Sequence, residues 1–255
     1  MILFFPKDLK LSNNSDLIKL PQACLANLLI YNKLKNCASF SPQITNIPFN
    51  LIPKQTESPE LKLSFTALAL GLREMEVVVP LYLEHSNWEE VGKLVNDENL
   101  FQLTSQASSI RVFREVRQRL QTLDPETLEI FTELDLDEKR AIALVAACKK
   151  YPFIFDFIRI TLKDKIQVFD QTLREEDLDV FWNSQTIKYP ELEEIADSTK
   201  KKLKQVLVRL LSEAQLLNST EDTWITPINP TTRVQSILEK EGLAYQDAFL
   251  TTFDT

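Results

Sequence analysis

Residues 190–228 decide the fold of this chain, and they read PELEEIADSTKKKLKQVLVRLLSEAQLLNSTEDTWITPI. The stretch predicts a short acidic helix over Pro190 to Ala196, a polar joint at Asp197-Ser198, and a long helix over 199–217. A short β-like segment, Trp224 to Thr226, follows the long helix. A short helix, a turn, a long helix and a strand form the order of a winged helix-turn-helix, which we therefore expect here.

The long helix has an apolar face and a basic face. At 100° per residue, Leu203, Leu207 and Leu210 fall within one arc, as in a helix packed on a core. At its front and outside that arc lie basic and amide side chains: Lys200, Lys201, Lys202, Lys204, Gln205 and Arg209. DNA recognition helices use Lys and Arg for phosphate and guanine, and Gln for adenine. Because lysines at a helix N-terminus oppose the macrodipole, we expect a ligand to account for them; a solvated surface helix is the alternative.

A second basic helix is predicted over 105–123. Val112, Val116 and Leu120 share one side of it. The opposite side and the start carry polar candidates: Ser108, Arg111, Arg114, Arg117 and Gln118. Arginine binds phosphate and guanine through its planar fork. The alternative is again a solvated face, with Glu115 as a salt-bridge partner. Since a short acidic helix precedes each basic helix, we expect two helix-turn-helix-like elements.

The composition predicts a mostly α, multi-helix protein with a little β-structure in the wing and in the N-terminal extension. Only three of 255 residues are glycine, which disfavours an all-β fold with many tight turns and any phosphate loop. Helix-forming residues dominate. Helices are expected over 66–84, 87–95 with Ser86 as N-cap, 105–123, a short stretch after Asp124, 137–150, 153–167, 175–187 and Thr231 to Gly242.

Proline spacing and helical patterning divide the chain into three expected domains. Residues 1–60 read as an N-terminal extension with irregular structure and one helix around Pro21 to Leu34. Residues 61–170 read as a helical domain with the first helix-turn-helix-like element. Residues 171–255 read as a winged-helix-like domain with a tail.

Net charge and cysteine usage restrict the compartment and the partners. The formal charge of −8 argues against nucleic acid, but only weakly, because one face of an acidic protein can be basic. Cys24, Cys37 and Cys148 are sparse and odd in number, so we expect free thiols in a reducing cytosol. The opening MILFFPKDLK does not read as a signal peptide, and no apolar run approaches the roughly 20 residues that span a bilayer. We therefore expect a cytoplasmic protein without a membrane partner.

Catalytic and metal-binding patterns are missing from the sequence. His85 is the single histidine, and no Cys, His or Asp cluster accompanies it. We expect no metal site, no cofactor and no enzymatic activity.

Six segments together resemble one protein family, the BrxA family of the BREX bacteriophage-exclusion systems, whose members were once labelled inner membrane proteins. The resemblance covers about residues 62–240 and depends on the order and spacing of individually weak motifs. The segments are LSFT (63–66), LYLEHSNWEEV (81–91), ENLFQLTSQASSIRVFREVRQRL (98–120), ACKKYPFIFDFI (147–158), EEDLDVFWN (175–183) and PELEEIADSTKKKLKQVLVRLLSEAQLL (190–217).

The resemblance implies an α-helical, non-enzymatic protein that binds double-stranded DNA, with little sequence preference, in phage defence. Family-level binding residues map to two sets: Ser108, Arg111 and Arg114, and Thr199, Lys201, Lys202 and Gln205. Other phage-exclusion proteins are expected as further partners, and the oligomeric state stays open. Two alternatives remain at this point. One is an interaction module of a defence complex that touches no nucleic acid, and the other is an RNA-binding helical protein.

Overall fold

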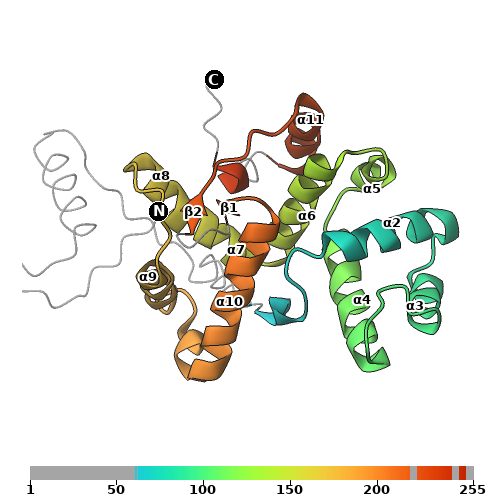
Figure 1. Ribbon diagram of the computed structural model, residues 1–255, viewed down its shortest axis with the longest axis horizontal. Coiled ribbons are helices and arrows are strands. Elements are labelled where there is room, and N and C mark those ends of the chain that lie inside the picture. The colour runs from blue at the N-terminus through green and yellow to red at the C-terminus, as the bar shows by residue number, and fades with distance from the viewer. Residues whose placement is uncertain (1–60, 62, 219–222, 243–246, 251–255) are drawn as a thin grey trace, which may run out of the picture. The chain divides into compact units, whose positions relative to one another are not determined.

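The protein is mostly α-helical, as predicted. The computed structural model describes residues 61, 63–218, 223–242 and 247–250 (Figure 1). Its elements, in chain order, are η3 (Ser64–Ala67), α2 (Leu72–His85), α3 (Trp88–Asp97), α4 (Gln106–Leu120), α5 (Pro125–Phe131), α6 (Leu136–Lys150), α7 (Pro152–Phe157), η4 (Ile158–Leu162), α8 (Lys163–Gln167), α9 (Glu175–Gln185), η5 (Pro190–Glu194), α10 (Asp197–Glu213), β1 (Leu217–Asn218), β2 (Trp224–Ile225) and α11 (Thr232–Glu241). The extension 1–60, with its predicted helix, lies outside the described residues.

Side-chain caps begin several of these helices. Asp124 accepts a hydrogen bond from the backbone N–H of Glu126, which confirms it as the N-cap of α5. The predicted cap of α3 was wrong by one residue: Asn87, not Ser86, accepts from two backbone N–H groups at the start of α3. Ser86 instead has a left-handed conformation that ends α2, with φ of 53°. The start of α6 is similarly shifted, because Asp135 forms its capping box.

A glycine breaks the helix that was predicted over 66–84. Residues Ser64–Ala67 form a short 3-10 helix, and α2 begins only at Leu72. Gly71 separates the two with φ of +77°, and a Cβ there would lie 2.3 Å from the Leu68 Cδ2 atom. Only glycine readily adopts this left-handed conformation with so little space for a side chain. The apolar pattern over 66–84 continues across the bend at Gly71, so the pattern did not predict the break.

The predicted helix over 153–167 is present but not uniform. A π-helical segment, η4, lies between α7 and α8. At the end of α8, Asp170 N donates to Lys165 O and Phe169 N donates to Ile166 O, which is the pattern of a Schellman motif. Phe169 occupies the left-handed position of that motif, where glycine is usual, with φ of 60°. Its side chain is 94% exposed.

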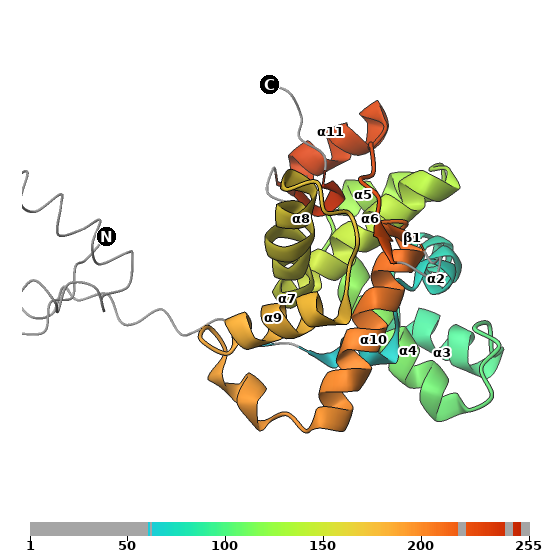
Figure 2. The same cartoon turned by 60° about the vertical axis from the view of Figure 1, so that its left-hand side comes forward.

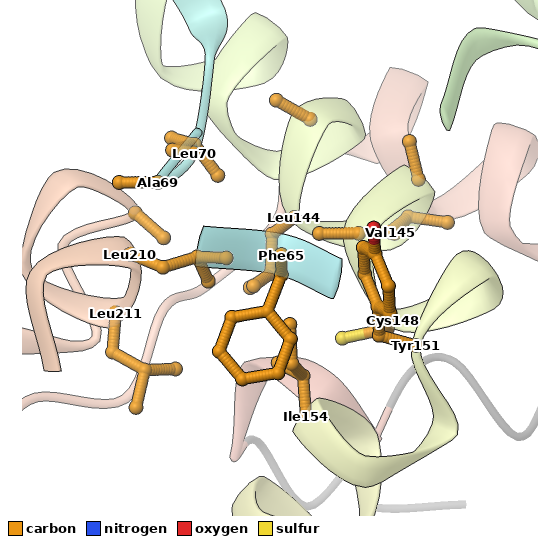
Figure 3. Close-up of a cluster of buried hydrophobic side chains, with 14 of the residues drawn as sticks. Phe65, Ala69, Leu70, Leu144, Val145, Cys148, Tyr151, Ile154, Leu210 and Leu211 are labelled. Atoms are coloured by element: carbon orange, nitrogen blue, oxygen red, sulfur yellow. The ribbon is translucent and has the colours of Figure 1, made fainter. Parts of the chain in front are cut away.

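The core centres on η3 and α6. Every residue from Ala141 to Cys148 is buried, and Figure 3 shows the Phe65 ring of η3 among side chains of α6, α7 and α10. Phe65 packs edge-on against Tyr151, with ring centroids 5.4 Å apart. Cys148 is free and buried, as expected, and burial raises the pKa of its thiol. Since Leu210 of α10 joins this core, side chains from 61–170 and 171–255 pack together.

The segment from η5 to β2 has the predicted order of elements for residues 190–228, but its helices differ in type and bounds from the prediction. The acidic helix is a 3-10 helix, Pro190–Glu194, rather than an α-helix to Ala196. Helix α10 covers Asp197–Glu213 instead of 199–217. Strands β1 and β2 pair antiparallel, with Leu217 opposite Ile225, and Trp224 also bridges to Thr172. The winged-helix architecture and the domain boundary near residue 170 stay predictions.

Candidate nucleic-acid interface

Helix α10 carries two kinds of lysine. Lys200 and Lys204 turn toward α9, where both contact one carboxylate oxygen, Asp179 Oδ1. The Lys200 Nζ lies 3.3 Å from that oxygen and 5.5 Å from the centroid of the Trp182 ring. Their side chains are only 24% and 13% exposed. These two predicted binding residues are therefore engaged within the protein.

The remaining polar candidates at the front of α10 are exposed. Lys201 and Lys202 form no ion pair with any residue that the structure describes, and Thr199 and Gln205 lie beside them on the surface. Arg209 is also exposed, but its Nε donates to Glu213 Oε1 at 2.8 Å. Of the predicted cations on α10, only Lys201 and Lys202 are exposed without a carboxylate partner among the described residues. Lys200, Lys204 and Arg209 already contact carboxylates.

A groove runs between α9 and α10 beside these lysines. Its volume is about 770 Å³. The lining charges come from both helices and from the residue before α9: Arg174, Glu175, Asp179, Asp197, Lys200, Lys201, Lys204 and Arg209. The groove is therefore of mixed charge, and its cationic wall is the α10 side.

Helix α4 presents the second predicted face. Arg111, Arg114 and Gln118 are exposed, and neither arginine forms an ion pair within the described part of the chain. Arg117 is half-buried, with its guanidinium carbon 5.9 Å from the centroid of the Trp88 ring. Ser108 accepts a hydrogen bond from the Ser105 hydroxyl, which caps the helix.

The alternative for α4 was a solvated face with Glu115 as a salt-bridge partner; the solvated face stays open, but Glu115 does not pair with the exposed arginines. Glu115 is buried and contacts Arg119, Lys150 and Tyr151. Arg119 is fully buried and donates to the carbonyl oxygens of Leu68, Ala69 and Leu70. Since Glu115 points into the core, no acidic side chain of α4 neutralises Arg111 or Arg114.

Close packing with α3 fixes the position of α4. A Cβ on Gly92 would lie 2.7 Å from Phe113 Cε1, so the glycine allows the two helices to approach. Trp88 of α3 stacks on Tyr82 of α2, with centroids 3.8 Å apart. Helices α2, α3 and α4 thus form one packed unit that holds the arginine face outward.

The two basic helices start on the same side of the described unit. Figures 1 and 2 both show α4 and α10 beginning toward the lower edge and rising from there. Ser108 and Arg111 lie in the first turns of α4, and Lys201 and Lys202 lie in the first turns of α10. One extended anionic ligand that lies along this edge could contact both helices.

No group of His, Cys, Asp and Glu among the described residues has a geometry that could hold a metal ion. His85 lies 3.2 Å from a Glu90 carboxylate oxygen. None of the described helices combines the length and the apolar character that crossing a membrane requires.

The family model and the curated relatives that match this chain carry the same name, BrxA. Residues 60–242 match the model of the BrxA family. The chain is 25% identical over 170 residues to the BREX protein BrxA of Escherichia coli O9:H4 (strain HS). This alignment covers 67% of this chain and 80% of that protein. It is 27% identical over 130 residues to the BREX protein BrxA of Bacillus cereus (strain H3081.97), which covers 51% of this chain and 65% of that protein.

A solved structure has a similar fold. The crystal structure of an uncharacterized protein from Magnetospirillum magneticum superposes with a TM-score of 0.66 at 21% sequence identity. The match covers 76% of this chain and 99% of that one. It extends the likeness from sequence motifs to the helical architecture.

Proposed function

We propose, from the premise that this chain belongs to the BrxA family, that it is a non-enzymatic, double-stranded-DNA-binding component of a BREX-type phage-defence system. The names of its relatives place them in BREX systems, and the ligand is argued from the residues of this chain. The proposed contacts are phosphates, with little dependence on base sequence.

One observation carries the proposal: helices α4 and α10 together present four exposed cations that have no ion-pair partner among the described residues. They are Arg111 and Arg114 on α4, and Lys201 and Lys202 on α10. The chain has 37 acidic residues against 29 Lys and Arg, so a shortage of carboxylates does not explain their isolation. Cations that remain unpaired on an acidic protein are available to an anionic ligand.

Duplex DNA fits this arrangement because its phosphates form a regular row of negative charge. The cations occupy two helices that begin along one edge of the unit, as a ligand longer than a single phosphate requires. Gln118 and Gln205 lie among them and can donate to phosphate or to base edges.

The test is a salt titration of binding to a short fluorescent duplex by anisotropy. Each phosphate contact contributes about −0.9 to the slope of log K against log salt, so four contacts predict a slope of about −3.6. The double variants Arg111→Gln/Arg114→Gln and Lys201→Gln/Lys202→Gln should each make the slope shallower by about 1.8.

A matched control removes the same charge elsewhere. Arg233→Gln/Lys240→Gln on α11 exchanges two exposed cations. Arg233 donates to the backbone carbonyl of Glu133 and lies 3.8 Å from Glu138 Oε2, and Lys240 contacts the Glu126 carboxylate. This variant should bind the duplex as the parent does. Equal binding by all three double variants and the parent would refute the assignment of α4 and α10. Titrations with RNA of the same sequence separate the RNA-binding alternative.

A second candidate function is favoured by a different observation. Val168 and Phe169, at the end of α8, are 71% and 94% exposed, and aromatic side chains commonly anchor protein interfaces. An interaction module of a defence complex would use such an anchor. Two results together would favour this function. The protein would bind no nucleic acid at low salt, and it would form a complex with another component of the system that Phe169→Ala abolishes.

A further inference from the structure

Asp179 holds two lysines that the proposed function would need for DNA. It lies in the second turn of α9, and its side chain is 45% exposed. Lys200 and Lys204 are four residues apart, one turn of α10, and both contact Asp179 Oδ1. A single anionic oxygen thus receives two ammonium groups from the recognition-like face.

Lys200 and Lys204 are largely buried where they meet Asp179. The Lys200 ammonium lies over the ring of Trp182, which is itself 4% exposed. Lys204 reaches the same oxygen from the next turn. Lys201 and Gln205, their neighbours on α10, line the same groove and remain exposed. Two lysines of the basic face are therefore occupied and the adjacent residues are free.

We infer, on the basis of the proposed function, that Asp179 occupies the position of a DNA phosphate in the free protein. Asp179 and the phosphates of a duplex beside the groove compete for Lys200 and Lys204, so in the parent the two lysines stay largely with Asp179 and add little to the four phosphate contacts proposed above. Carboxylate and phosphate oxygens accept the same charge-assisted hydrogen bonds from an ammonium group, so one anion replaces the other at these lysines. Asp179 is then an internal competitor that weakens binding and lowers its salt dependence.

The competition operates throughout the neutral range of pH. Hydrogen bonding from Lys204 holds the pKa of the Asp179 carboxyl below its usual range. The carboxylate therefore stays ionised near pH 7 and competes with phosphate continuously.

The experiment compares Asp179→Asn with the parent in the salt titration described above. Asparagine keeps the size and a side-chain acceptor but removes the charge. We expect affinity at low salt to rise about fivefold to tenfold, and the slope to become steeper by up to about 1.8, because two lysines become available. Far-ultraviolet circular dichroism and thermal unfolding check that the variant keeps its helices.

Two controls separate this effect from net charge. Glu129→Gln on α5 removes one exposed carboxylate that has no ion-pair partner among the described residues, and it should change neither affinity nor slope. Adding Lys200→Gln and Lys204→Gln to Asp179→Asn should abolish the gain. A gain that survives in the triple variant, or that equals the effect of Glu129→Gln, overturns the inference.

The outcomes also distinguish this inference from the proposed function. Tight binding by the parent with no gain in Asp179→Asn overturns the role of Asp179 alone. A loss of thermal stability in Asp179→Asn without a gain in affinity assigns Asp179 to holding α9 against α10. No binding by either protein at low salt overturns the proposed function and this inference with it.

Discussion

Replacing Arg119 by methionine tests how the arginine-rich helix α4 is anchored. Arg119 is fully buried and serves four acceptors. Its donated hydrogen bonds run to Glu115 Oε1 at 2.8 Å, Ala69 O at 2.5 Å, Leu70 O at 2.9 Å and Leu68 O at 2.9 Å. Methionine retains much of the apolar stem and removes all of these donors.

The cost follows from the acceptors that are left behind. Removing one partner of a buried ion pair costs about 3–5 kcal/mol. Glu115 would keep its contacts with Lys150 and Tyr151, which limits the cost of removing its arginine partner. The three carbonyls would each lose a donor, and an unsatisfied buried acceptor costs about 1–3 kcal/mol. We expect a loss of about 4 kcal/mol in the free energy of unfolding, or about 8–16 °C in Tm.

Urea denaturation followed by circular dichroism measures this loss. Arg114→Met, on the exposed face of the same helix, is the matched control and should stay within about 0.5 kcal/mol of the parent. Arg119→Lys should lie between the two, because an ammonium group cannot span the acceptors that the guanidinium fork reaches. A loss below about 1 kcal/mol for Arg119→Met would show that the buried guanidinium gives no net stabilisation.

Three further changes test other parts of the structure. Gly92→Ala places a Cβ 2.7 Å from Phe113 Cε1, so it should cost about 1–3 kcal/mol in thermal unfolding. Phe169→Gly relieves a left-handed aromatic residue with an exposed side chain and should raise stability by about 1 kcal/mol; a decrease would contradict this account. The hydrogen bond from Arg174 holds the pKa of the Asp170 carboxyl well below its usual range, so its stabilisation, complete above about pH 4, declines as pH falls further. Asp170→Asn should flatten that acid limb of the unfolding curve.

Periodicity predicted the helices and their buried faces because burial repeats with the helical turn. Leu203, Leu207 and Leu210 are all in the core, as their spacing indicated. The sequence could not predict the first residue of a helix where two possible capping residues are adjacent, as at Ser86-Asn87. Which one caps depends on how the preceding helix ends, and the left-handed Ser86 decides it.

The candidate face could be predicted only in part. Winding alone indicated that Lys201 and Arg114 are exposed. It could not indicate that Asp179 takes two lysines, because that pairing joins separate helices. Nor could it find the role of Arg119, whose carbonyl partners lie 49 to 51 residues away in sequence. Tertiary partners, not helical position, decide which cations of a basic helix remain free.

Helix α11 also supplies a hydrogen-bond acceptor to the start of the earlier helix α5. Glu241 of α11 accepts hydrogen bonds from Asp124 N at 2.8 Å and from Thr127 Oγ1 at 2.9 Å, at the start of α5. During synthesis, α5 therefore leaves the ribosome more than a hundred residues before the carboxylate that accepts these hydrogen bonds. Until α11 is made, Asp124 can still cap α5, but the Asp124 N–H and the Thr127 hydroxyl lack their carboxylate acceptor and must bind water.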